Sequence, residues 1–192
     1  MKTLDLLVSF SPWLIFAALV VYTPVPFEIT LLASLAASLL VGYRDLRDRF
    51  IIAWTTTLFF AVVSVLVLVI GLFEIVPLLG VASNGVLLLV TVGSLLAGAP
   101  FTEQYARREV SEEEWTDPFF LRLNRQLTVF WGLMFVVGLT SEVLYVLYPG
   151  ALGVVTDICI WLPIVGGAVF SARYPDYAEK RASLAGPASV LR

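Results

Sequence analysis

The stretch that decides the fold is Phe50–Leu72, FIIAWTTTLFFAVVSVLVLVIGL, in which 23 consecutive residues carry no charge. At about 1.5 Å per residue, a helix of this length spans roughly 35 Å, which is enough to cross a hydrocarbon core of about 30 Å. The apolar residues run continuously and do not alternate with polar ones, which excludes a transmembrane strand. The stretch therefore predicts a transmembrane helix.

The rest of the chain has the same character. Hydrophobic residues make up 59% of the 192 residues and charged residues 14%, whereas soluble domains have about 45–50% and about 25%. We therefore expect an all-α polytopic membrane protein, in which residues 1–175 form one bundle of six transmembrane helices and residues 176–192 form a cytoplasmic polar tail. The expected spans are 4–22, 27–43, 50–72, 76–98, 118–147 and 151–172.

The basic residues predict the orientation of the bundle. Lys and Arg occur near the N-terminus, in the second and fourth connections with the residues that follow, and in the C-terminal segment, while the other three connections contain none. Six spans place all of these basic segments on one side, which the positive-inside rule makes cytoplasmic. We therefore expect both termini in the cytoplasm. The basic segment 44–49 is interpreted as a headgroup anchor, with phosphate binding as the alternative.

Composition excludes several classes of function. The net charge is −3 at pH 7, and phosphate binding needs a basic surface, so we expect no nucleic-acid partner. The chain has no histidine and a single cysteine, Cys159. Zinc, haem and iron–sulfur sites depend on these residue types, so we expect no metal and no cofactor. Motifs for a P-loop, a nucleophile elbow and a zinc protease are missing, which favours a protein that is not an enzyme.

The fourth connection, residues 99–117, carries signals of local structure. We expect Phe101–Val110 to form a short interfacial helix with Thr102 as its cap. Arg107 and Arg108, on that helix, are expected to meet lipid phosphates.

Two helix-start signals follow in the same connection. Ser111 and Glu114 fit a capping box, in which each side chain accepts a hydrogen bond from the backbone amide of the other residue. Asp117 and Pro118 fit an N-cap followed by the first helical position. Helix 118–147 is therefore predicted to begin in the cytoplasm before it enters lipid.

Polar residues within spans are the default functional candidates in a membrane protein. Glu142 and Asp157 are expected at matching depths near the outer side, on helices joined by a tight turn. They form either a shared hydrated pocket, which could relay a proton or hold a cation, or two separately hydrated carboxylates near the interface, which is the interpretation we favour. Asn84 is the only amide inside a span and is interpreted as a hydrogen-bonding contact between helices.

The fourth connection and the helix after it carry a family resemblance. The segment Ala99–Arg107, APFTEQYAR, is followed by Trp115, by the pair Leu123-Asn124 and by Trp131. This arrangement resembles the intracellular septation protein A-like group of small bacterial inner-membrane proteins. The resemblance implies a location in the bacterial inner (plasma) membrane and an association with envelope synthesis and division through other membrane proteins.

The resemblance also implies that Trp115, Leu123, Asn124 and Trp131 organise the cytoplasmic entrance of helix 118–147. The candidate cytoplasmic interaction surface is made of Arg107, Arg108, Trp115, Asn124, Arg125 and Trp131.

Three functions remain open at this point. The leading hypothesis is a non-enzymatic membrane protein of the envelope that binds lipids or partner membrane proteins, a second copy of itself included. The second is a small transporter or channel subunit that uses Glu142 and Asp157. The third, a membrane enzyme acting on lipids, is disfavoured by the missing histidines and acid-pair motifs.

Overall fold

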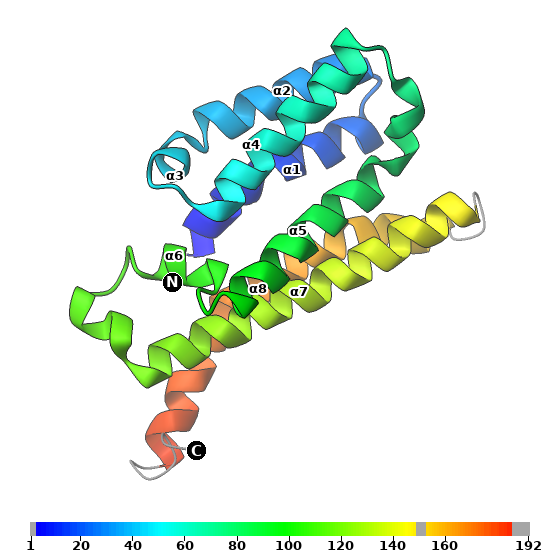
Figure 1. Cartoon of the computed structure of the whole chain (residues 1–192). Helices are drawn as coiled ribbons and strands as arrows, with labels where there is room; N and C mark the ends of the chain where they lie inside the picture. Colours follow the sequence, from blue (N-terminus) through cyan, green and yellow to red (C-terminus); the bar gives the residue numbers. More distant parts are fainter. Residues whose placement is uncertain (1–2, 149–152, 186–192) are drawn as a thin grey trace.

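The computed structural model describes the backbone of residues 3–148 and 153–185, and the side chains of residues 8–148, 161–181, 183 and 184. Within these residues the chain is all-helical, without strands, as the sequence predicts (Figure 1). Among the described residues, three helical stretches are long and apolar enough to cross a membrane, namely Ile51–Val69, Phe73–Leu96 and Pro118–Leu147. Two shorter apolar helices, Val8–Tyr22 and Phe27–Leu40, accompany them. These stretches indicate a membrane protein.

The helices pack in two groups, which Figure 1 shows side by side. The first group is α1 (Thr3–Tyr22), α2 (Phe27–Leu40) and α4 (Ile51–Ser64), with the short α3 (Tyr43–Arg47) between α2 and α4. A π-helical turn, Val65–Val69, extends α4. Gly71 then adopts a φ of +78°, a conformation that favours glycine, and ends the helix there.

The second group is α5 (Leu79–Leu96), α7 (Pro118–Leu147) and α8 (Gly153–Ala185), in which α7 packs against both of the others. A 3₁₀ turn, Phe73–Leu78, leads into α5. The connection from α5 to α7 contains α6 (Phe101–Ala106) and a second 3₁₀ turn, Glu112–Thr116.

Aromatic side chains join the two groups through α1. The Trp131 ring of α7 is fully buried and stacks on Phe10 of α1, with ring centroids 4.7 Å apart and planes 7° apart. The indole Nε1 of Trp131 donates to the Ser171 hydroxyl of α8 at 3.0 Å. Gly167 lies under the same ring, since an added Cβ there would come within 2.6 Å of it. One side chain thus links three helices.

Several helix boundaries differ from the expected spans. The run 27–43 ends as α2 at Leu40, and a separate α3 follows. The last helix does not end near residue 172 but continues as α8 to Ala185, through Pro163 and Pro175. The predicted bounds 118–147 match α7.

Candidate functional site

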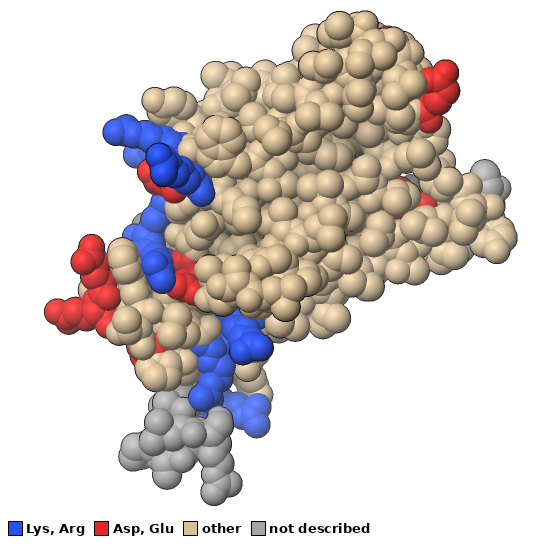
Figure 2. All heavy atoms as spheres, in the orientation of Figure 1, with Lys and Arg blue, Asp and Glu red and all other residues tan. Residues whose placement is uncertain are grey.

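Charged side chains gather at one end of the molecule. Figure 2 shows Lys and Arg at the end where Figure 1 places α3, α6 and the start of α7. We call it the polar end, and it contains the closest long-range polar contacts of the described residues. The sequence predicts such an accumulation of basic residues, but it does not predict how their side chains pair.

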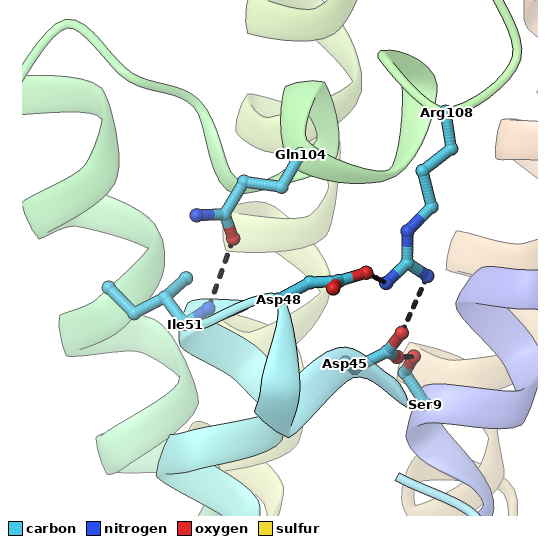
Figure 3. Close-up of polar contacts among 6 residues, drawn as sticks. All are labelled: Ser9, Asp45, Asp48, Ile51, Gln104 and Arg108. Carbon is cyan, nitrogen blue, oxygen red and sulfur yellow. Dashed lines mark hydrogen bonds and ion pairs between the residues drawn. The ribbon is translucent and has the colours of Figure 1, made fainter. Parts of the chain in front are cut away.

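Arg108 is the centre of this pairing (Figure 3). Its Nη1 lies 2.6 Å from Oδ1 of Asp45, and its Nη2 pairs with Oδ2 of Asp48. The Ser9 hydroxyl of α1 donates to the other oxygen of Asp45. We call these four residues the Arg108 junction. It links α1, the α2–α4 connection and the α5–α7 connection.

Burial makes these contacts strong. Asp45 is 7% exposed and the Arg108 side chain 28%, and a carboxylate removed from water needs a cation and hydrogen bonds to remain charged. Burial alone would lower the pKa of Arg108, but the hydrogen bonds and charges of Asp45 and Asp48 outweigh it and raise that pKa. The guanidinium also lies 3.9 Å from the centroid of the Phe50 ring, which adds a cation–π contact.

Tyr105 of α6 lies beside the junction and is 1% exposed. Burial raises the pKa of its hydroxyl well above the usual value. The neighbouring Ser9 side chain lowers this pKa in part, and the negative charge of Asp45 raises it further. The ring meets Phe50 edge-on, with centroids 4.8 Å apart. The phenol therefore stays neutral at any physiological pH.

α6 also caps α4. The backbone N–H of Ile51, in the first turn of α4, donates to Oε1 of Gln104 at 3.0 Å (Figure 3). The first amides of a helix have no partner within it, so a side chain from another segment satisfies one of them here.

A second polar contact fixes α6 on α7. The Thr102 hydroxyl donates to the carbonyl of Asn124 at 2.8 Å and lies 2.9 Å from the Thr128 hydroxyl. Asn124 is 1% exposed, and its amide nitrogen donates to the Phe120 carbonyl of its own helix. The prediction that Thr102 caps the interfacial helix is wrong, because its hydroxyl is used between helices and Pro100 holds the cap position.

The two arginines of the connection are paired within the protein. Arg107 forms an ion pair with Glu103 one turn earlier, and its guanidinium lies 4.9 Å from the centroid of the Trp115 ring. Arg108 belongs to the junction. The expectation that both meet lipid phosphates thus misses these internal partners, although the Arg107 side chain remains 44% exposed.

The two helix-start signals have different outcomes. Asp117 caps α7 as predicted, since its Oδ1 accepts from the Phe119 amide at 3.0 Å with Pro118 at the first position. The predicted capping box is wrong. The Ser111 hydroxyl instead lies 3.2 Å from the Glu114 carboxylate, and the segment forms a 3₁₀ turn whose tighter geometry misaligns the box.

The candidate interaction surface is only partly exposed. Arg107 and Arg125 lie at the surface and Trp115 is half-buried, but Asn124 and Trp131 are fully buried. The surface as predicted is therefore wrong for those two residues, which hold helices together. Sequence reasoning also missed Ser9, Asp45, Gln104 and Tyr105. The only sequence signal for the Arg108 junction is the pair of acids within the basic segment 44–49. Nothing in the sequence identifies the partner of these acids.

Two polar residues within the long helices, Glu142 and Asn84, pack against glycines of the neighbouring helix. The Glu142 carboxylate of α7 lies against Gly80 of α5, and the Asn84 amide of α5 lies against Gly138 of α7. The amide nitrogen of Asn84 donates to the Gly80 carbonyl at 3.0 Å. Asp157 is in α8, but its side chain is outside the described residues, so its pairing with Glu142 stays a prediction.

No group of three or more His, Cys, Asp or Glu side chains that could hold a metal ion occurs in the described part of the chain. The chain matches no protein-family model, no curated protein and no solved structure.

Proposed function

We propose that this chain is a non-enzymatic integral membrane protein of the cell envelope that acts by binding a partner within the membrane, in first place a transmembrane helix of another protein. The observation that carries the proposal is an open apolar groove between α4 and α5, with a volume of about 630 Å³. It is lined by Thr55, Leu58, Phe59, Val62, Val63, Leu66, Ile75, Leu78, Leu79, Ala82, Val86 and Val90.

The spacing of the lining residues suits a helix. Leu58, Val62 and Leu66 recur every four residues on one wall, as do Ala82, Val86 and Val90 on the other. Rows of this spacing form the ridges between which a ridge of another helix packs. Only Thr55 brings a polar group to the lining, so the groove suits an apolar partner better than a dissolved solute.

We also propose that the chain crosses the bacterial inner membrane six times with both termini in the cytoplasm. The three long apolar helices and the two shorter ones support several crossings. The accumulation of Lys and Arg at the polar end supports a cytoplasmic position for that end. A reporter fused after Arg192 is expected to be active only in the cytoplasm, and external activity would contradict this orientation.

The resemblance to the septation protein A-like group adds the proposal that the partner belongs to the machinery of envelope synthesis or division. This part of the proposal rests on the resemblance alone, which is carried by Ala99–Arg107, Trp115, Leu123, Asn124 and Trp131.

Native mass spectrometry of protein released gently from its own membranes tests the partner. We expect a discrete added mass, which identifies a different protein or, if the mass doubles, a second copy of the chain. Ala82→Phe fills the groove and is expected to remove the added mass. The control Val129→Phe, on an exposed face of α7, is expected to keep it. A bare monomer in the wild type would contradict the proposal.

A transporter or channel subunit is the second candidate, favoured by the carboxylate of Glu142 inside the long helix α7. For this candidate, native mass spectrometry is expected to show a bound ion or small molecule that is lost in Glu142→Gln but retained in Ala82→Phe.

A further inference from the structure

The basic segment 44–49 forms an exposed patch at the polar end. It covers α3 and the turn into α4, and Figure 2 shows Lys and Arg side chains where Figure 1 labels α3. Arg44 and Arg47 are three residues apart on α3, a spacing that places two side chains on the same face of a helix. Arg49 follows in the turn, and all three arginines are exposed. We call these three residues the arginine patch.

The acids of the same segment are used elsewhere. Asp45 and Asp48 alternate with the arginines in the sequence, an order in which the segment could neutralise itself. Both carboxylates instead pair with Arg108 from the α5–α7 connection. Within the described part of the chain, no guanidinium of the arginine patch forms an ion pair or a hydrogen bond. The patch therefore offers its positive charge to an anion from outside the chain.

Arg49 occupies a backbone position that favours glycine. Its φ is +61°, and it is the one non-glycine residue with a positive φ among the described residues. Its amide donates to the Leu46 carbonyl at 3.2 Å, and the next amide, that of Phe50, donates to the Asp45 carbonyl at 2.8 Å. These two bonds form a Schellman motif, in which the left-handed residue is usually glycine. A long side chain kept in such a conformation points to a use for its exposed guanidinium.

Exposed aromatic and apolar side chains border the arginine patch. Tyr43 begins α3, Trp54 lies in the first turn of α4, and both are exposed. The Trp54 indole donates to the Leu46 carbonyl at 3.0 Å, which holds its ring beside α3. Leu40, at the end of α2, is also exposed. Trp and Tyr concentrate at the membrane–water interface, so this setting places the patch at the level of the lipid headgroups.

We propose that the arginine patch binds the phosphate of an anionic phospholipid, whose acyl chains lie against Leu40 and Trp54. A guanidinium binds phosphate oxygens through paired N–H groups. Several unpaired guanidinium groups favour a headgroup such as that of phosphatidylglycerol, which has no cation of its own. In phosphatidylcholine the phosphate is balanced by the choline. The patch shares no residue with the α4–α5 groove, so either can fail without the other.

The test uses the purified full chain in detergent and native mass spectrometry with phosphatidylglycerol and phosphatidylcholine of identical acyl chains. We expect the wild type to bind phosphatidylglycerol at least about tenfold more tightly. The double variant Arg44→Gln/Arg47→Gln is expected to reduce this preference to about twofold or less. The matched control, Arg125→Gln/Arg173→Gln, removes two exposed arginines of α7 and α8 and is expected to keep the preference.

Arg49→Gly separates binding from folding. Glycine adopts the positive φ without strain, so the melting temperature without lipid is expected to stay the same or rise. The affinity for phosphatidylglycerol is expected to fall about threefold, because one guanidinium is lost. An unchanged affinity in this variant would contradict a role for Arg49 in binding.

Equal affinities for the two lipids in the wild type would overturn the proposal. So would a preference that survives Arg44→Gln/Arg47→Gln, or an equal loss in the control variant, which would indicate attraction by net charge alone. Soluble glycerophosphoglycerol, the same headgroup without acyl chains, separates a lipid from a dissolved phosphate ester. Failure to displace the lipid at a tenfold excess supports a lipid ligand, and full displacement at equimolar concentration overturns it.

Discussion

The polar end and the seam between α4 and α5 join the two helix groups in opposite ways. At the polar end, the buried Asp45 holds Arg108 from a connection 63 residues away, and the adjacent Phe10–Trp131 stack closes the packing. In the seam, apolar walls leave a groove of about 630 Å³. Apolar contacts between helices gain little over contacts with lipid tails, whereas a buried carboxylate needs its one cation. A buried ion pair thus holds the two groups together at the polar end, whereas the apolar contact between α4 and α5 leaves a groove.

The largest expected effect comes from the closed packing beside the junction. Gly167→Ala places a methyl group within 2.6 Å of the buried Trp131 ring, which Phe10 prevents from moving. Overpacking of this kind costs about 2–3 kcal/mol. Gly93→Ala is the control, because an added Cβ there meets nothing within 4 Å; it is expected to stabilise α5 slightly, since alanine favours helices. The free energy of unfolding in mixed micelles measures both, and equal effects would contradict the described packing.

The next effect tests the junction itself. Arg108→Gln leaves the buried Asp45 without its cation, and we expect a loss of about 2 kcal/mol, less than for a fully buried pair because Arg108 is partly exposed. Arg47→Gln removes an exposed arginine of the same end and is expected to change stability by under about 0.5 kcal/mol. Unfolding in mixed micelles compares the two. A loss of similar size in both variants would mean that the polar end depends on net charge and not on this pairing.

The pH dependence gives a smaller and more selective effect. Because the folded pKa of Tyr105 is raised above its unfolded value of about 10, the folded state favours the neutral phenol. Its contribution to stability is complete below pH 10 and declines above it, by up to about 1.4 kcal/mol per pH unit. Wild type is therefore expected to lose stability more steeply than Tyr105→Phe between pH 10 and 11. Parallel curves for the two proteins would show that Tyr105 does not contribute to the loss of stability in this pH range.

The smallest effect is expected in the seam. Val62→Ala shortens a groove side chain that is 52% exposed, so lipid replaces its contacts and unfolding is expected to change by under about 0.5 kcal/mol. A loss above about 1.5 kcal/mol, as found for packed side chains, would show that the seam is closed in the membrane.

Local sequence signals predict much of the fold but little of the candidate site. Asp117-Pro118 marks the start of α7 because a cap acts within one turn. The capping box at Ser111 fails because the same local chemistry is compatible with a 3₁₀ turn. Thr102 shows a further limit of local signals. Its hydroxyl donates to a backbone carbonyl of α7 and does not cap its own helix. The Asp45–Arg108 pair joins distant segments, and only their packing brings the charges together.

Site-specific photo-crosslinking in living cells tests whether the seam between α4 and α5 is open to a membrane partner. A photoreactive residue at position 62 in the groove is compared with one at position 133, where Leu133 is similarly exposed on α7 outside the groove. We expect a discrete crosslinked protein from position 62 and only diffuse lipid adducts from position 133. The same diffuse adducts from both positions would contradict it.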